Sequence, residues 1–326
     1  MKKICLTYDY ELFFKESGTI ENCILKPTYA TLDILNRNNQ VANFFIDVLF
    51  LIRLKEFELE CDNLRKIIDQ LQFMVKNGHR IELHLHPHWL DAEYKDGNWI
   101  FPHYDHYRLN SLPISTITNL FVSGTQFLEE IAREVISDYK VRAFRAGGWS
   151  IQPFHKLKEG FIKAGIEIDS SVAPGLKEKG DRFYDFLNAP KKESWRFSDD
   201  PLEEDINGSF LEIPIQVYKK TFKDRLNKYI YHKCTNDVIF GDGKGLLGAP
   251  VKFSFKKIKN KFKSTISMLT SDSVSAKELT SAIDKSFMDT VIIINHPKSM
   301  LKKRGIDSLN KLKKYESVLL INIIND

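Results

Sequence analysis

The sequence predicts an α/β protein, a distorted (β/α) barrel of about seven parallel strands. Short apolar runs rich in β-branched residues alternate with longer amphipathic runs, which is the pattern of βαβ units. Polar clusters follow three of the short runs, where parallel barrels place their reactive groups. The length of 326 residues suits one large barrel. We interpret residues 1–326 as a single domain with an insertion at about 218–274.

The elements follow from the hydrophobic periodicity. Asp9 and Glu11 follow the N-terminal apolar run before it reaches the length of a signal-peptide core, so this run is interpreted as the first strand. The other candidate strands are 42–47, 80–84, 143–145, 166–170, 211–215, 291–295 and 318–324, after the first at 3–8. Helical periodicity predicts helices at 27–38, 61–76, 114–135, 152–164 and 275–288.

Composition excludes several classes of protein. The 48 basic and 43 acidic residues give a net charge of +5, too small for a chain that coats nucleic acid, and no nucleic-acid partner is expected. The four cysteines form no C-x-x-C pair, which favours reduced thiols in a cytosol. No run of 18 uncharged apolar residues occurs, so no membrane span is expected. The expected location is the cytoplasm.

Two segments break the alternation of strands and helices. Residues 91–112 form a long aromatic loop that we expect to pack beside the site. Residues 251–264 hold six lysines and no acid, with Phe255, Ile258 and Phe262 at helical spacing. This pattern fits either a surface helix packed on the barrel or an interfacial helix that contacts the inner face of a membrane peripherally.

A histidine cluster is the strongest chemical signal. His84, His86 and His88 fall within five residues at the end of a strand-like run. Neutral imidazole is the commonest metal ligand, so the cluster predicts a metal site. Pro87 interrupts the strand, and only His84 and His86 then share a face. The spacing leaves open which two histidines bind.

Two carboxylates end the first strand. Asp9 and Glu11 lie two residues apart and share a face of an extended backbone. Two carboxylates in one site can divide the work, one binding the metal and the other accepting a proton. The pair therefore predicts a hydrolytic centre beside the histidines.

The chain resembles the polysaccharide deacetylase family, the carbohydrate esterases of family 4 that share the NodB homology domain. The resemblance covers roughly residues 3–217 and 275–324. Residues 7–9 resemble the family's T-F-D-D motif, and 78–88 resemble its G-H-E-I-x-x-H-x-x-x-H motif. Further matches, in the family's order, are 42–46 (A-T-F-F-V), 144–150 (R-x-P-Y), 165–171 (G-Y-x-Y-D-S-S), 212–214 (E-I-P) and 294–297 (L-H).

The resemblance implies a NodB-like barrel with one divalent metal, zinc or a similar ion, held by an acid and two histidines. It places Asp9 as the catalytic base, His296 as the general acid and Arg145 as the group that orients the base. His84 and His88 fall on the metal histidines. Tyr10 stands where the family has its metal-binding aspartate, so either Glu11 replaces that ligand or Asp9 binds the metal itself. The extra histidine, His86, leaves a His84/His86 pair open.

Three more residues are expected near the substrate. Trp89 and Trp149 could stack on sugar faces. Asp169 either supports Arg145 and Asp9 or caps the segment that follows it.

The resemblance implies a metal-dependent hydrolase that removes an acetyl or formyl group, N- or O-linked, from a sugar in surface polysaccharide biosynthesis. The expected substrate is an N-acylated sugar, a sugar nucleotide or a lipid-linked glycan. Two alternatives are a related-barrel hydrolase of another C–N or glycosidic bond and an inactive carbohydrate-binding homologue. Neither a P-loop nor a G-x-G-x-x-G turn after a strand is present.

Overall fold

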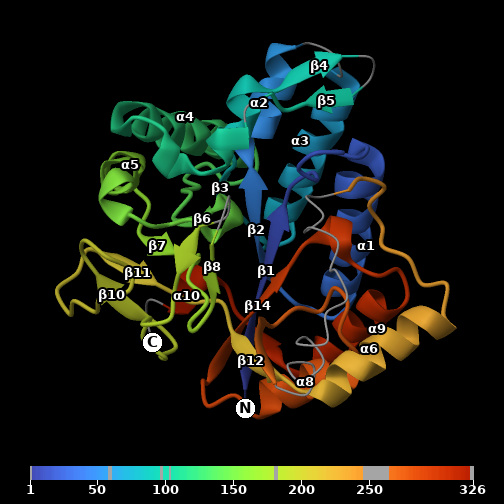
Figure 1. The fold of residues 1–326 in the computed structure, drawn as a ribbon. Helices are drawn as coiled ribbons and strands as arrows, with labels where there is room; N and C mark the ends of the chain where they lie inside the picture. The colour runs from blue at the N-terminus through green and yellow to red at the C-terminus, as the bar shows by residue number, and fades with distance from the viewer. Residues whose placement is uncertain are drawn as a thin grey trace.

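The protein is described by a computed structural model that covers residues 2–57, 61–95, 98–102, 104–179, 183–244 and 264–323. A curled sheet of nine strands forms its centre, in the order β10-β11-β7-β6-β3-β2-β1-β14, with β15 beside β1. The seven strands from β11 to β14 in this order pair in parallel. The predicted distorted (β/α) barrel is thereby confirmed (Figure 1).

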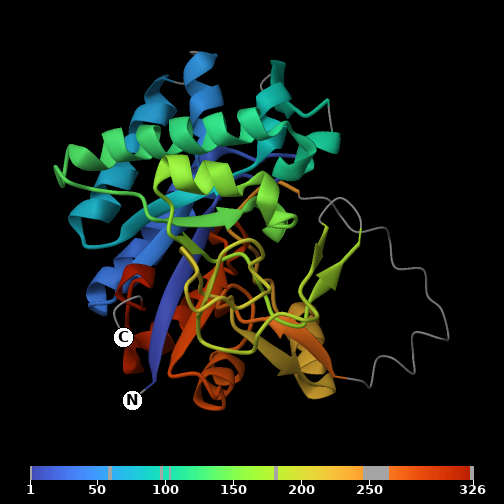
Figure 2. The ribbon, with the colours of Figure 1, turned by 90° about the vertical axis from the view of Figure 1, so that its left-hand side faces the viewer.

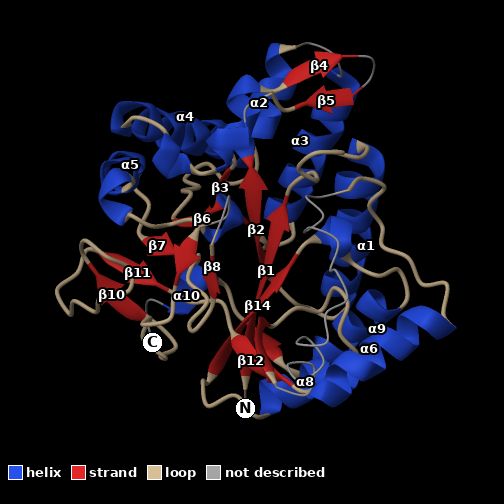
Figure 3. Ribbon diagram, viewed as in Figure 1, coloured by secondary structure: helices blue, strands red, loops and turns tan. Residues whose placement is uncertain are grey.

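The elements alternate as the sequence predicts, with most helices outside the sheet (Figure 3). The strands of the main sheet are β1 (Lys3–Tyr10), β2 (Ala42–Asp47), β3 (Arg80–Leu85), β6 (Ala143–Ala146), β7 (Ile168–Asp169), β10 (Trp195–Phe197), β11 (Phe210–Glu212), β14 (Thr290–Asn295) and β15 (Glu316–Ser317). Three hairpins add β4 (Glu93–Lys95) to β5 (Asn98–Ile100), β8 (Lys177–Glu178) to β9 (Tyr184–Asp185) and β12 (Val217–Lys220) to β13 (Thr265–Met268).

The helices surround this sheet. They are α1 (Lys26–Arg37), α2 (Val48–Glu56), α3 (Cys61–Lys76), α4 (Ile114–Arg133), α5 (Lys158–Ala164), α6 (Phe222–Cys234), α8 (Ala276–Asp284), α9 (Arg304–Lys311) and α10 (Leu320–Ile323). The long helix α4, green in Figure 2, packs on β3 with Phe121, Gly124 and Leu128 buried. No helix among the described residues is long and apolar enough to cross a bilayer.

Both faces of the parallel strands are buried, which explains why their sequences are almost continuously apolar. The faces that point outward pack against the helices, as Phe144 does against Phe121 and Phe161. The inward faces form a second cluster inside the barrel, composed of Cys5, Phe45, Ala143, Ile168, Leu211, Ile213, Ile292 and Leu320. The barrel interior is therefore a packed core, and chemistry is confined to the rim above it.

The barrel closes through loop backbone. After β11 the chain stays extended, and Ile215 N donates to Val172 O at 2.8 Å. Gln216 N then donates to Ile292 O of β14 at 3.1 Å. These bonds join the two sides of the sheet where no described strand pairs with the far side of β14.

The prediction of a last strand at 318–324 is wrong. The chain forms the short β15 and then α10, whose Leu320 is fully buried with the residues inside the barrel. Leu320 N donates to Asn43 Oδ1 at 3.3 Å, which ties the helix to the barrel interior. A short apolar run does not by itself distinguish a buried strand from a buried helix.

The predicted insertion at 218–274 contains most of β12, then α6 and β13 in its described residues. Of the lysine-rich segment 251–264, residues 251–263 lie outside the described residues, so the interfacial helix stays a prediction from the sequence. The aromatic loop 91–112 forms the β4–β5 hairpin and short 3-10 turns.

Candidate active site

The carboxyl ends of the parallel strands bring the chemical groups together. The arrows of β1 and β2 point to the top of Figure 1, and the site lies at this end. The register pairs Asp47 with His84, and His84 with Arg145. Tyr8 pairs with Asn295 of β14, so the next residues, Asp9 and His296, also become neighbours.

Glu11, His84 and His86 form the group that could hold a metal ion, because one ligand atom from each lies within 4.8 Å of the others. Glu11 Oε2 is 3.3 Å from His84 Nε2 and 2.5 Å from His86 Nε2. Among the described residues, His86 Nδ1 has no hydrogen-bond partner, while its Nε2 faces Glu11. A buried imidazole that faces a carboxylate and a second imidazole fits a divalent cation.

His84 is held in the tautomer that a metal ligand needs. Its Nδ1 lies 2.7 Å from the carbonyl oxygen of Arg145, so Nδ1 carries the proton and Nε2 presents a lone pair toward Glu11. Burial alone would lower the pKa of His84, but the nearby carboxylates, Glu11 first among them, raise it above its ordinary value.

Glu11 is compensated by a buried lysine that the sequence analysis did not identify. Lys298 Nζ lies 3.0 Å from Glu11 Oε1 and donates to Leu12 O at 2.6 Å. Burial would raise the pKa of Glu11, but Lys298, followed by His86, holds it well below its usual range. One carboxylate oxygen thus faces the lysine and the other faces the two histidines.

The absence of a side chain at Gly147 leaves room for the ring of His86. A Cβ at Gly147 would stand 2.6 Å from Leu85 O and 2.8 Å from His86 Nδ1, closer than real Cβ atoms approach. Any other residue at Gly147 would therefore displace the backbone or the ring.

His88 lies outside the candidate metal group. Its ring packs among aromatic side chains, 4.4 Å from Phe14 and 5.0 Å from Phe101 between ring centroids. Burial, and then the charge of His86, lowers the pKa of His88 well below its ordinary value. Of the two pairs that the sequence left open, the geometry favours His84 and His86 over His84 and His88.

Trp89 supports the site from the core. It is 1% exposed, so it has no free ring face to offer a sugar. Its indole Nε1 donates to Asp47 Oδ2 at 2.6 Å, and Asp47 Oδ1 has no hydrogen-bond partner among the described residues. Burial raises the pKa of Asp47 to about 6. Asp47, which the sequence analysis did not identify as a site residue, thus adds a buried carboxyl group beside the histidines.

Asp9 is held by Arg145, as the resemblance implies. Arg145 Nη1 donates to Asp9 Oδ1 at 2.6 Å, and both side chains are buried. Three more hydrogen bonds from the guanidinium group go to Thr7 Oγ1 at 3.0 Å and to the carbonyl and hydroxyl oxygens of Ser170 at 2.8 and 3.1 Å. A buried charged pair held by this network fixes the Asp9 carboxylate in one orientation.

His296 completes the group from β14. Its Nε2 lies 3.4 Å from Asp9 Oδ2, and its backbone N–H donates to Asp272 Oδ2 at 2.9 Å. Burial would lower the pKa of His296, but Asp272, followed by Asp9, raises it above its ordinary value. His296 therefore keeps a proton more readily than a free histidine.

Trp149 stands beside His296 in a rare backbone conformation. Its φ is +60°, which is an outlier for a bulky residue. The rings of Trp149 and His296 meet edge to face with centroids 6.3 Å apart. Trp149 is partly exposed, in contrast to Trp89, so its ring is available to a bound molecule.

Asp169 lies behind the site and is fully buried. It accepts from Ser171 Oγ at 2.7 Å, and Ser171 Oγ accepts from Ala146 N at 2.9 Å. Its neighbour Glu212 is its partner in the β7–β11 register. Burial, and then the charge of Asp169, raises the pKa of Glu212 well above its usual range. Burial of the pair therefore favours the protonated form of Glu212.

We expect Glu212→Gln to be at least as stable as the natural protein at pH 8, with an advantage that shrinks toward pH 4. A carboxyl group whose pKa is raised on folding loses stability as pH rises from its unfolded pKa, by at most about 1.4 kcal/mol per pH unit. An amide carries no such cost. Urea unfolding across this pH range measures the difference, with Glu212→Ala as the control that should be destabilised throughout. A deficit of Glu212→Gln that grows with pH would contradict the raised pKa of Glu212.

Comparison of the sequence with family models and with curated proteins finds no match. Among solved structures, the chain is similar to a protein from Mycobacterium smegmatis provisionally assigned as a polysaccharide deacetylase, at 13% identity and a TM-score of 0.50, over 99% of this chain and 90% of that one. A family 4 carbohydrate esterase from Streptomyces lividans follows at 10% identity and a TM-score of 0.42, over 96% and 86%. A 4-alpha-glucanotransferase from Thermococcus litoralis is similar at 11% identity and a TM-score of 0.48, over 100% of this chain and 41% of that one.

Only the first of these reaches a TM-score of 0.5, and at 13% identity it establishes the fold. That fold is the one implied by the motifs in the sequence. The resemblance is thereby confirmed at the level of the fold, for a chain that has diverged far in sequence.

Proposed function

We propose that this protein is a metal-dependent carbohydrate deacylase, which hydrolyses an N- or O-linked acetyl or formyl group on a sugar. The observation that carries the proposal is the placement of Glu11, His84 and His86 next to Asp9 and His296. His296 Nε2 is 3.4 Å from Asp9 Oδ2 and 3.9 Å from Glu11 Oε1, so it links the two groups.

The ligands proposed for the metal are His84 Nε2, His86 Nε2 and Glu11 Oε2. Two imidazoles and one carboxylate suit zinc or a similar divalent ion. When bound, such an ion polarises an acyl carbonyl and lowers the pKa of a coordinated water. Asp47, buried near these ligands, interacts with His86 and His84 through its charge.

The protein's own side chains supply the proton transfers. Asp9, fixed by Arg145, accepts the proton of the attacking water. His296, whose proton is stabilised by Asp272, donates a proton to the departing amine or alcohol. Trp149 offers a ring face to the sugar beside His296.

The substrate proposed is an N-acylated sugar, a sugar nucleotide or a lipid-linked glycan of surface polysaccharide biosynthesis, and the place of action is the cytoplasm. The free thiols of Cys5, Cys23 and Cys234 suit a reducing compartment. Peripheral contact with the membrane through 251–264 remains a prediction from the sequence.

We expect Lys298→Met to weaken zinc binding by about 10- to 100-fold, the usual effect of losing a partner of a metal ligand. Without the ammonium group, burial would favour the protonated form of Glu11, which cannot bind a cation well. Competition with a chromogenic chelator measures the zinc dissociation constant. Lys298→Arg, which keeps the charge, is the matched control, and an unchanged constant for Lys298→Met would show that the ion pair does not serve the metal.

The function is tested by measuring acetate and formate released from a panel of acylated sugars, sugar nucleotides and lipid-linked sugars by the zinc-loaded protein. Small amides, ureides and glycosides in the same panel represent the related-barrel alternative. We expect release from an acylated sugar, abolished by a chelator and restored by zinc. Cleavage of a small amide or glycoside with no acyl release would replace the proposal by that alternative. Sugar binding without turnover of any panel member would favour an inactive homologue.

A further inference from the structure

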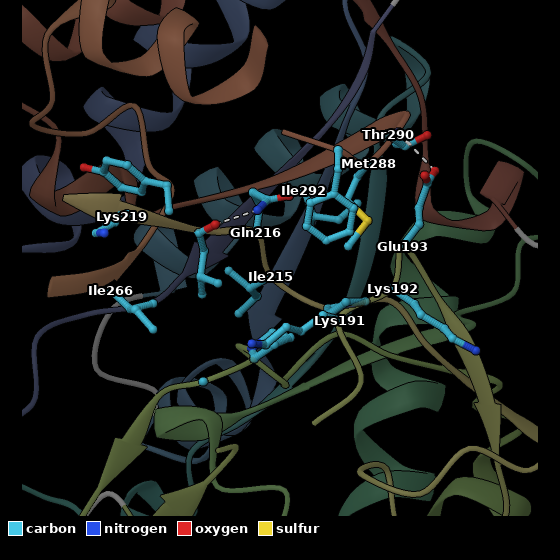
Figure 4. Close-up of a pocket in the computed structure, with 16 residues that line it drawn as sticks. Lys191, Lys192, Glu193, Ile215, Gln216, Lys219, Ile266, Met288, Thr290 and Ile292 are labelled. Atoms are coloured by element: carbon cyan, nitrogen blue, oxygen red, sulfur yellow. Dashed lines mark hydrogen bonds between the residues drawn. The ribbon is translucent and has the colours of Figure 1, made fainter. Parts of the chain in front are cut away.

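A cavity of about 220 Å³ opens on the flank of the barrel, away from the active site. It lies where loop backbone closes the barrel, between the chain after β11 and the beginning of β14 (Figure 4). Thr290 lines the cavity and begins β14, whereas His296 follows the last residue of the strand. Six residues at about 3.3 Å each place the two about 20 Å apart along the strand.

Much of the cavity wall is apolar. Ile215 and Ile292 are buried at the wall, and Met288 lies beside them in Figure 4. At the rim, Ile266 is 49% exposed and Phe287 is 72% exposed. Apolar side chains left open to water beside a preformed cavity mark a binding surface more often than isolated exposed residues do.

The charged groups at the mouth of the cavity differ in their partners. The carboxylate of Glu193 accepts hydrogen bonds from the backbone N–H groups of Asp289 and Thr290 at 3.0 and 3.1 Å. Lys192 Nζ lies 2.5 Å from Glu204 and its side chain points away from the cavity in Figure 4.

Lys191 differs from Lys192 in both respects. Its side chain runs along the cavity beneath Ile215 in Figure 4. No described acidic side chain forms an ion pair with Lys191, or with Lys219 on the other side of the mouth. The mouth therefore carries a net positive charge beside its apolar wall, because Lys191 and Lys219 outnumber the carboxylate of Glu193.

We propose that this cavity binds a single-chain anionic amphiphile, with the hydrocarbon chain against Ile215, Ile266 and Ile292 and the anionic head on Lys191. An apolar wall selects the chain, and the unpaired ammonium selects the charge of the head. The volume is below the roughly 300–1,000 Å³ of sites that enclose a whole ligand, so the cavity holds one end of a longer molecule. This inference does not depend on the proposed catalytic activity.

The test is calorimetric titration of the full-length protein with decyl phosphate, held below the concentration at which it forms micelles. Decanoate, decanol and inorganic phosphate are parallel arms. We expect saturable binding of decyl phosphate or decanoate that is at least about tenfold tighter than binding of decanol or inorganic phosphate. The comparison of the two anionic arms distinguishes a phosphate head from a carboxylate head.

Two variants locate the site. Lys191→Gln should weaken binding by about fivefold through the lost charge. Ile266→Asp, at a half-exposed position that tolerates a polar residue, should weaken it by at least about tenfold. Lys192→Gln is the matched control and should bind as the natural protein does. The proposal would be overturned if no binding is found, or if Lys191→Gln and Ile266→Asp bind as tightly as the natural protein. It would also be overturned if inorganic phosphate binds as tightly as decyl phosphate.

Discussion

His84→Ala and His86→Ala are expected to lose zinc, whereas His88→Phe is expected to keep it. Each of the first two changes removes one of three proposed ligands. Loss of a residue that only supports a ligand weakens metal binding by about 10- to 100-fold, so the dissociation constant for zinc should rise by more than that. His88 lies in an aromatic cluster with Phe14 and Phe101, where phenylalanine preserves packing. Elemental analysis and chelator competition measure the metal content and affinity.

The same three variants separate the two histidine pairs that the sequence leaves open. If His88→Phe loses the metal and His86→Ala keeps it, the ligand pair is His84 and His88, as the family motif implies. Thermal unfolding of each variant shows whether a loss of metal merely follows a loss of structure.

Asp9→Asn and His296→Gln are expected to lower turnover by at least about 100-fold each while zinc stays bound, because general acid–base groups contribute about 10²–10⁴-fold. Asn keeps the size of Asp9 and can still accept from Arg145, but it cannot take the proton of water. Gln at 296 cannot donate a proton at neutral pH. Single-turnover rates on the substrate found in the panel, with metal content measured in parallel, give the result. Near-normal rates for both variants would contradict the assigned roles.

Asp272→Asn is the control that distinguishes a positioning residue from a catalytic one. Asp272 raises the pKa of His296, so its loss should lower that pKa. The proton on His296 would then be lost at lower pH, and the alkaline limb of the rate profile should move to lower pH with a smaller loss at the optimum. A uniform loss at every pH, without displacement of the limb, would point to a structural role only.

Much of the fold could be predicted because both faces of its strands are buried. The range 42–47 is reproduced residue for residue as β2, and 61–76 as α3. The helix α2 was not predicted, since it begins directly after β2 and continues the same apolar run. The antiparallel β10 was also not predicted, because three residues carry no clear alternation.

The site was predicted where it depends on strand register and was left open where it depends on a turn. Asp9, His84, Arg145 and His296 end parallel strands and therefore meet. The choice between His86 and His88 depends on how the chain turns at Pro87–Asp91, which spacing alone does not fix. Asp47 could have been found by the argument used for Asp9, as a carboxylate that ends an apolar strand. Lys298 gave no comparable signal, because its contact with Glu11 depends on the turn Pro297–Ser299.

The central claim is that Glu11, His84 and His86 form a metal site next to Asp9 and His296. Anomalous diffraction from crystals of the zinc-loaded protein, collected on both sides of the zinc absorption edge, tests it most directly. The account predicts one strong peak at about 2.0–2.2 Å from His84 Nε2, His86 Nε2 and a Glu11 oxygen. A peak coordinated by His88, or a fully loaded protein whose zinc lies away from Glu11, would contradict it.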